Sequence, residues 1–396
     1  MPLVSYQVPG ASARAGITFD RLGATLSTLT LIALVLLPVV TLQPNRILPG
    51  EGVELEQLAR YPTFMLFLGL LILTLTGVTV VSRHWIRLGL ATLTLLALVV
   101  ATGSIASPLL DNRGAFARLA LGSGFWAIGL LLGLMMTDAV VKMGLSARWR
   151  LVIVTVCLGA IVSVLSSGLW DHLSLMLEYR NQERFWAQGG RHLLLAFGSV
   201  LPALLIGVPL GIGCHRSAAL RTFMIPLLSL LQTIPSLAMF GLLMIPLTLL
   251  TQAFPVLNEL GIRGIGAAPA VLALFLYSLL PIVSNTAAGF DGLNPAVIDA
   301  ARGMGMNARQ RLWQVQLPLA LPVMLSGLRI VVTMNIGLVA VAGLIGGGGY
   351  GTYIFQGLGQ TATDLVLLGT LPTIVLAFVA ALVIDTLIEF SRKERG

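Results

Sequence analysis

Few side chains in this 396-residue sequence stand where they could do covalent or metal chemistry. The four histidines are dispersed near the ends of apolar runs, which favours interfacial residues over metal ligands. Cys157 and Cys214 lie far apart, within or at the edge of such runs, and predict no disulfide framework. No metalloprotease, serine-hydrolase or paired-carboxylate pattern occurs where a membrane-embedded site could use it. We therefore predict that the chain is not an enzyme and binds no metal or cofactor.

Two features could suggest nucleotide chemistry. Gly346, Gly348 and Gly351 satisfy the dinucleotide pattern G-x-G-x-x-G, but they follow a long apolar run and no βαβ unit surrounds them. A tight turn with its backbone close to a neighbour is the stronger interpretation. A P-loop needs a lysine directly after its glycines, and the only two lysines, Lys142 and Lys393, stand in no such loop. If ATP drives this protein, another chain must bind it.

A polar, patterned segment at 289–317 separates two apolar runs. Asn294–Pro295 is an N-cap residue followed by the residue favoured at the first position of a helix. Ala296, Ala300 and Gly303 would give that helix a smooth face of small residues, which allows close docking into a groove. The spacing therefore predicts a short capped helix with a docking face.

A second short helix is predicted after a glycine hinge at 303–305. Asn307 can cap it, with Gln310 in capping-box position, and Arg309 and Arg311 fall among the exposed groups. Two capped helices joined by a hinge and anchored by flanking spans form a rigid knob that can transmit displacement. The residues alone leave open an ordinary amphipathic connector lying on a membrane.

Long apolar helices must hold this segment in place. Apolar residues make up 57% of the chain and charged residues only 10%. A hydrocarbon core of about 30 Å needs roughly 20 helical residues, so each long apolar run is a candidate span. We predict an all-α polytopic membrane protein with about ten transmembrane helices, the run at 222–252 being one span broken at Pro235. The predicted spans are 22–43, 62–82, 88–106, 119–141, 151–170, 192–214, 222–252, 268–288, 318–343 and 365–390.

The distribution of basic residues predicts the orientation of these spans. With the amino terminus inside, fifteen arginines and lysines fall inside and eight outside, with Arg329 left within a span. Both termini are therefore expected in the cytoplasm. The basic residues are scattered and form no cluster of the size of a nucleic-acid groove, so nucleic acid is not an expected partner. Residues 1–17 show no removable signal peptide.

Charged and apolar residues alternate from Asp171 to Arg191, which suits an interfacial helix or loop. We therefore expect an amino-terminal bundle of about five helices at 1–172, an extracytoplasmic linker at 173–191 and a second bundle of about five helices at 192–396.

The segment at 289–317 resembles a known motif. Asp299-Ala300-Ala301, three residues, Gly305, nine residues and then Val315-Gln316-Leu317-Pro318 is similar to the EAA motif of bacterial ABC importer permeases, whose spacing is EAA-x3-G-x9-I-x-LP. Asp299 replaces the usual Glu and is one methylene shorter. Val315 replaces the usual Ile, a mild change of size.

Further stretches narrow the resemblance. Residues 231–237, 277–285 and 344–351 look like the permeases of glycine betaine, choline and related osmoprotectant importers, and the likeness extends over roughly 190–390. The five leading spans look like a long variant of that branch. The resemblance implies a type I ABC importer permease core preceded by a five-helix bundle, in the bacterial cytoplasmic membrane.

The resemblance also implies partners and roles. The partners would be a cytoplasmic ABC ATPase dimer that binds ATP and Mg²⁺, a second permease copy or paralogue, and a periplasmic substrate-binding protein. The residues expected to couple to the ATPase are Asp299, Ala300, Ala301, Gly305, Arg309, Arg311, Leu317 and Pro318, with Leu317-Pro318 fixing a turn into the next span. Candidates for the translocation path are Gln232, Thr233, Ser236, Tyr277, Ser284, Asn285 and Asn335.

Three alternatives remain open at this point. A methionine-type amino-acid ABC permease is the nearest. A secondary transporter would show carboxylates near the bilayer midplane, and a structural membrane protein would bind no ATPase. Arg329 is expected to be paired or to snorkel rather than to bind a cationic solute.

Overall fold

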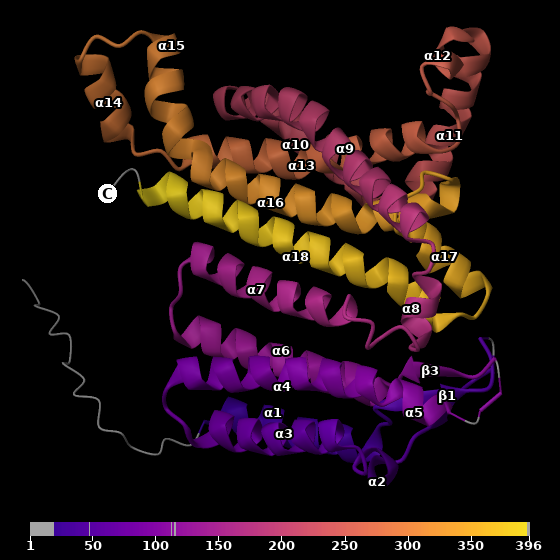
Figure 1. Cartoon of the computed structure of the whole chain (residues 1–396). Coiled ribbons are helices and arrows are strands. Elements are labelled where there is room, and N and C mark those ends of the chain that lie inside the picture. Colours follow the sequence, from indigo (N-terminus) through magenta and orange to yellow (C-terminus); the bar gives the residue numbers. More distant parts are fainter. Residues whose placement is uncertain (1–19, 47, 112, 115, 394–396) are drawn as a thin grey trace, which may run out of the picture. The chain divides into compact units, whose positions relative to one another are not determined.

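A computed structural model describes residues 20–46, 48–111, 113–114 and 116–393, which form a largely helical chain divided into two compact units (Figure 1). The first unit is made by residues up to Pro44, Gly50–Leu145 and Ala160–His172. The second is made by Asn45–Pro49, Ser146–Gly159 and the chain from Leu173 on. Residues 1–17, where no signal peptide is predicted, lie outside the described residues.

The described residues include nine helices that are long and apolar enough to cross a membrane. Eight of them coincide with predicted spans, and the ninth is the second half of the broken run at 222–252. The remaining prediction, at 22–43, is a 16-residue helix that ends at Leu36. Pro38 explains the early end, because a proline disfavours helical geometry at the residue before it. The predicted all-α, multi-span fold is confirmed.

The first unit contains six helices and three short strands. They are α1 (Arg21–Leu36), β1 (Val40–Gln43), β2 (Glu51–Gly52), α2 (Leu55–Leu58), α3 (Pro62–Val80), α4 (His84–Ser104), α5 (Ala106–Leu110), β3 (Arg118–Leu121) and α6 (Ser123–Lys142). α7 (Ala147–Leu165) is shared between the two units, and none of its residues is buried.

The strands of the first unit were not predicted. They form an antiparallel sheet in the order β2-β1-β3, with Thr41 opposite Gly52 on one side and Ala120 on the other. In the sequence β1 lies at the end of the apolar run at 22–43, and its four alternating residues are too few to distinguish a strand from the end of a helix. Pairing with strands far along the chain is what makes this segment extended.

A cluster of charges ties together the helix ends of the first unit. The Asp20 carboxylate caps α1 by accepting from the Gly23 N–H, and it also accepts hydrogen bonds from Arg87 and Lys142. Lys142 pairs in addition with Asp138 at 2.8 Å. Although burial alone raises the pKa of the Asp20 carboxyl, the hydrogen bonds from Lys142, Arg87 and Gly23 hold it well below its usual range. The Asp20 carboxylate therefore stays ionised, and its contacts join α1, α4 and α6.

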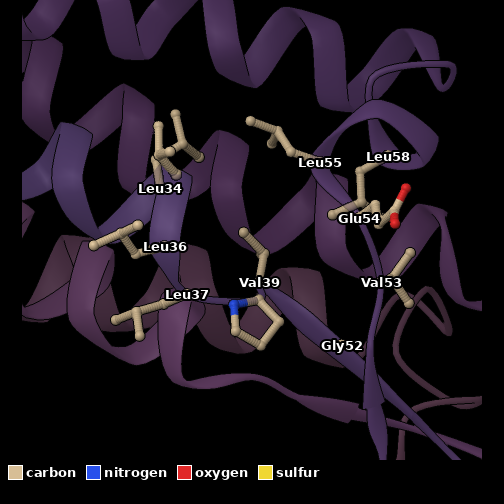
Figure 2. A pocket seen from close by; sticks show the side chains of 11 residues that line it. Leu34, Leu36, Leu37, Val39, Gly52, Val53, Glu54, Leu55 and Leu58 are labelled. Carbon is tan, nitrogen blue, oxygen red and sulfur yellow. The ribbon is translucent and has the colours of Figure 1, made fainter.

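A cleft of about 390 Å³ opens between the end of α1 and the β2–α2 segment (Figure 2). Apolar side chains line most of it, with Leu34, Leu37 and Val39 on one side and Leu55 and Leu58 on the other. A single lining residue, Glu54, is charged. The cleft therefore offers no set of convergent titratable groups of the kind that acid–base chemistry uses.

The second unit contains the remaining helices. They are α8 (Ser174–Glu178), α9 (Gln182–Arg216), α10 (Ala218–Thr233), α11 (Ser236–Ala253), α12 (Val256–Glu259), α13 (Ala267–Asp291), α14 (Pro295–Gly303), α15 (Ala308–Arg311), the π-helical η1 (Leu312–Gln316), α16 (Leu317–Ala342), the 3₁₀ turn η2 (Gly343–Ile345), α17 (Gly351–Gly359) and α18 (Thr363–Lys393).

The core of the second unit lies between α9, α13, α16 and α18. Its fully buried apolar side chains include Ala203 on α9, Leu274 on α13 and Ile336 and Val339 on α16. The stretch predicted as a linker at 173–191 contains α8 and the first ten residues of α9. Asn181 caps α9 through its side chain, so the helix starts at Gln182, ten residues before the apolar run predicted from 192.

The glycine-rich stretch at 346–349 is a turn held against α9. Gly346, Gly348 and Gly349 have φ values of +76°, +84° and +82°, which only glycine adopts without strain. The Gln188 Oε1 atom accepts from the Gly349 N–H at 2.7 Å, and Arg191 Nε donates to the Gly347 carbonyl at 3.1 Å.

His192 adds two further contacts from the same face of α9. Its Nε2 lies 2.9 Å from the Ile336 carbonyl, and its Nδ1 accepts from the Tyr350 N–H at 3.2 Å. Because a carbonyl can only accept and an amide N–H can only donate, the ring must carry its proton on Nε2. His192 is fully buried, whereas the sequence predicts an interfacial residue. The glycines thus serve a backbone turn, as the sequence indicates.

Candidate functional site

The segment that leads from α13 to α16 starts from a fixed point. Asp291, the last residue of α13, accepts hydrogen bonds from His215 Nδ1 at 2.6 Å and from Arg221 at 2.7 Å. His215 lies at the end of α9 and Arg221 near the start of α10, so three helix ends meet there. The polar segment follows directly, and Figure 1 shows α14 and α15 projecting from the end of the second unit where α16 begins.

α14 forms as its sequence predicts. Asn294 Oδ1 accepts from the Ala296 N–H at 3.0 Å, and Pro295 occupies the first position of the helix. Ala300 and Gly303 are exposed together with Ala296, so the face of small residues is available for docking. Ala301, by contrast, is only 2% exposed and packs inward. A direct contact of Ala301 with another protein is therefore excluded in this conformation.

The hinge between α14 and α15 depends on Gly305. Its φ is +79°, a left-handed conformation, and a Cβ atom there would meet nothing within 4 Å. A side chain at this position would therefore be strained by the backbone and not by crowding. The Met306 N–H donates to the Ala301 carbonyl at 3.2 Å, which closes the end of α14.

α15 begins with the predicted capping box. The Gln310 N–H donates to Asn307 Oδ1 at 2.9 Å, and the Asn307 N–H donates to Gln310 Oε1 at 2.8 Å. Two backbone donors at the helix start are thereby satisfied.

The predicted turn at Leu317–Pro318 is wrong. α15 continues through η1 into α16, and the Leu317 N–H donates to the Leu312 carbonyl, five residues back. Pro318 has no N–H and would interrupt an ordinary helix, but near a helix start and beside a π-turn its missing donor leaves no bond broken. The second short helix and the transmembrane helix are therefore one continuous rod.

Some charged residues of the segment have partners within it, and others do not. The Asp299 carboxylate lies 3.3 Å from Arg302, and both side chains are more than 60% exposed, so this pair contributes little to stability. Arg311 donates to the Met306 carbonyl at 2.8 Å and fastens the hinge. Arg309 is exposed and makes no ion pair with any residue in the described ranges. Arg309 is therefore the free cation of this surface, while Arg311 has an internal role.

Exposed apolar side chains on the segment escaped the sequence analysis. Met304 is 74% exposed, Trp313 is 60% exposed and Val297 is 42% exposed. Met304 stands between two glycines at the end of α14, where no neighbouring element can cover it. The sequence signal that could have predicted its exposure is an apolar residue flanked by two glycines in a polar loop. Together with Ala296, Ala300 and Gly303, these side chains make much of the exposed surface of the segment apolar.

The candidate path residues do not form one cluster. At the break between α10 and α11, Gln232 Nε2 donates to the Tyr277 carbonyl at 2.8 Å, and the Tyr277 hydroxyl donates to the Ile234 carbonyl at 2.5 Å. Pro281 lacks the N–H that would otherwise bind the Tyr277 carbonyl, so Gln232 replaces a helix hydrogen bond. Gln232 and Tyr277 therefore join the broken span to α13.

Asn335 belongs to a separate polar contact. Its Nδ2 donates to Ser199 Oγ and Ser278 Oγ, each at 2.9 Å, which links α16 to α9 and α13. Its Oδ1 is buried without a partner among the described residues. Three fully buried side chains in the helix core bind helices together and do not line an open path.

The remaining candidates are bonded to their own helices or stand at the break. Ser284 donates to the Leu280 carbonyl and Asn285 to the Pro281 carbonyl, both within α13. Thr233 is exposed and Ser236 is half-buried, one on each side of the break. Of the seven candidates, Thr233 is the exposed one.

The sequence of the second unit has well-characterised relatives. The family described as binding-protein-dependent transport system inner membrane component matches residues 203–393. An osmoprotectant import permease protein, OsmW, of Salmonella typhimurium is 44% identical over 189 residues, which are 48% of this chain and 83% of that protein. This chain belongs to that permease family.

Two further comparisons extend this result. The glycine betaine/carnitine/choline transport system permease protein OpuCD of Bacillus subtilis is 37% identical over 198 residues, which are 50% of the permease and 80% of that protein. Residues 20–176 match the N-terminal domain of ABC transporter permease YehY. A solved structure of the MetNI methionine ABC transporter, in an inward-facing conformation, aligns over 55% of the permease at a TM-score of 0.46 and 20% identity.

Membership of this family establishes the general role. The permease is a multi-pass inner membrane component of an ABC transporter and not its ATPase, as the sequence predicts. An ATPase and a binding protein are the general partners of such a component.

Proposed function

We propose that this permease imports an osmoprotectant such as glycine betaine or choline, and that the segment from Asn294 to Pro318 couples it to a separate cytoplasmic ATPase dimer. The observation that carries the coupling role is the arrangement of α14 and α15. Two capped helices joined at Gly305 project from the second unit, and the second continues into α16 without a break. Movement of this surface therefore moves a transmembrane helix directly.

The chemistry of the surface supports a protein partner. Its apolar side chains, Met304 and Trp313, are largely exposed, and Arg309 supplies a cation at the rim. Such a mixture of aromatic, methionine and arginine side chains is typical of the contact residues in protein interfaces. The small residues Ala300 and Gly303 allow a groove on the ATPase to approach the backbone of α14 closely.

The solute class is supported by the relatives. Permeases named for osmoprotectants, for glycine betaine, carnitine and choline, and for choline alone are 34–44% identical over about half of this chain. A periplasmic binding protein would deliver the solute, and a second copy or a paralogue would complete the membrane complex. Both termini and α14–α15 would face the cytoplasm, which agrees with the bias of basic residues.

Replacing Gly305 tests the proposal. A Gly305→Val variant should keep its amount in the membrane but lose at least about 90% of uptake, because a β-branched residue strains the φ of +79° and reorients α15. Gly241→Val is the matched control, since an added Cβ there also meets nothing within 4 Å, but Gly241 has ordinary helix geometry within α11 and is not part of the segment.

The measurement is uptake of labelled glycine betaine, choline and methionine into cells that express the whole importer and lack other carriers. Full uptake and full ATPase co-purification by Gly305→Val would contradict the coupling role. Uptake of methionine alone would replace the osmoprotectant assignment by the amino-acid alternative.

A further inference from the structure

An ion pair joins two transmembrane helices of the second unit. Arg329, in the middle of α16, places its Nε atom 3.2 Å from Asp385 Oδ1 on α18. The Arg329 side chain is 49% exposed and that of Asp385 is 28% exposed. The pair therefore stands at the surface of these helices and not inside their contact.

The charges of this pair need a polar environment. Arg329 is twelve positions past Leu317 at the start of α16, about 18 Å at about 1.5 Å per residue, whereas Asp385 is eight positions before the end of α18, about 12 Å. A charge inside a transmembrane helix costs roughly 2.5–3.5 kcal/mol or more when it faces hydrocarbon. Water or a polar ligand therefore suits the exposed part of the pair better than lipid does.

The face of α16 around Arg329 is polar over several turns. Ser326 lies three residues before Arg329 and Thr333 four residues after it, which places all three on one side of the helix. Their hydroxyls donate to carbonyls of their own helix, so they add polarity without needing a partner from another element. Such a stripe suits a hydrated passage and not a lipid contact.

Most of the Arg329 guanidinium is uncommitted. Asp385 Oδ1 lies 3.2 Å from Nε, and no hydrogen bond joins either Nη atom to a residue of the described chain. Arginine binds carboxylates best through two parallel N–H donors, and this fork still has donors to offer. The Asp385 carboxylate faces this one cation, and 28% of its side chain remains exposed.

We infer that Arg329 and Asp385 form a contact for zwitterionic solutes, in which the Nη donors of Arg329 bind the solute carboxylate and Asp385 attracts the quaternary ammonium. The inference rests on the proposed function and deepens it. It also revises the expectation that Arg329 has no part in solute binding, because the partner acid supplies the negative charge that a cationic group needs. The pair offers both signs of charge to a molecule that carries both.

The two residues should affect different solutes differently. Glycine betaine has a carboxylate and a quaternary ammonium, whereas choline has only the ammonium. An Arg329→Gln variant should therefore lower the maximal rate of glycine betaine uptake at least about tenfold and change that of choline less than about twofold. An Asp385→Asn variant should lower both, since both solutes lose the anion.

The experiment compares maximal uptake rates in cells that express the complete importer, at solute concentrations that saturate the binding protein. Arg329→Gln is expected to fold with Asp385 still ionised, because the pair is partly exposed and the glutamine amide keeps an N–H donor that can face the Asp385 carboxylate. Ile330→Ala, at an exposed neighbour on the same helix, is the matched control. Membrane abundance and the amount of co-purified ATPase are measured for every variant.

A lowered ratio of glycine betaine to choline uptake in Arg329→Gln supports the inference. An unchanged ratio overturns it, whether both rates stay normal or fall together, because a purely structural ion pair would not distinguish the solutes. If the unmodified importer transports neither solute, the proposed function and this inference fall together. A normal unmodified importer with an unchanged ratio removes the inference alone.

Discussion

Single residues in the second unit replace hydrogen bonds that the helices lack. Gln232 binds the Tyr277 carbonyl that Pro281 leaves free, and His192 accepts the Tyr350 N–H at the glycine turn. Both are polar side chains in apolar surroundings, which a sequence alone equally allows as solute contacts. The distinction needs the tertiary partner, because each side chain serves a backbone group on another element.

His192 provides a test at this scale. A His192→Leu variant leaves the buried Tyr350 N–H without an acceptor, which costs about 1–3 kcal/mol. The expected result is a fall of at least about 2 °C in the melting temperature of the purified permease in detergent. His84→Leu is the control, because His84 Nδ1 is buried with no partner among the described residues. Equal melting temperatures for the two variants would show that the His192 contacts contribute nothing.

Among the elements, the segment from Asn294 to Pro318 was the most predictable from sequence. Its capping contacts are local, because they join residues that are only two or three positions apart. The types and spacing of Asn294, Pro295, Asn307 and Gln310 are therefore enough to predict both helix starts. The continuous path from α15 into α16 was not predictable in this way. Proline usually marks a boundary, and the five-residue hydrogen bond that accommodates Pro318 leaves no sequence pattern.

Other elements were misplaced for tertiary reasons. β1 is extended because distant strands pair with it, and α9 begins at Gln182 because Asn181 caps it and its first turns pack against the glycine turn. Ala300 and Ala301 match their motif positions equally well, yet Ala301 is buried and Ala300 is exposed. Local spacing predicts that a helix forms, whereas its packing decides which face remains free.

The capping box can be tested at the scale of the helix. An Asn307→Ala variant loses the bond from the Gln310 N–H and should destabilise α15 by about 1 kcal/mol. Asn307→Ser keeps a capping oxygen and is the control. Hydrogen exchange of the amides in α15, followed by mass spectrometry on the purified permease, should become about fivefold faster in the alanine variant only. Equal exchange in both variants would mean that packing and not the cap holds α15.

At the scale of the whole molecule, the order of long helices was predicted because apolar length is a property of the sequence. The second unit includes the chain from Leu173 on, but also Asn45–Pro49 and Ser146–Gly159, and the domains predicted at 1–172, 173–191 and 192–396 stay predictions. The orientation of the spans across the membrane also stays a prediction, because it depends on the bias of charge and not on contacts.

Cysteine labelling tests that orientation. In a chain with Cys157 and Cys214 replaced by alanine, Leu358→Cys on α17 and Arg309→Cys on α15 place single thiols beyond opposite ends of α16. A membrane-impermeant maleimide added to intact cells should label position 358 and not position 309, because both termini and α15 are expected inside. Inside-out vesicles should reverse the pattern. Labelling of both positions from one side would contradict the predicted arrangement of spans.

The rod that runs from α15 through α16 has a mechanical consequence. Its far end is held by Gln188, Arg191 and His192 at the glycine turn, so that end can act as a fulcrum. α16 alone has 26 residues and is about 39 Å long at about 1.5 Å per residue. A tilt of about 10° around the fulcrum sweeps the other end through about 7 Å, the scale of a helix turn. Leverage of this kind converts a small rotation at the glycine turn into a large displacement of the α14–α15 end, and a displacement of that end into a small rotation at the turn.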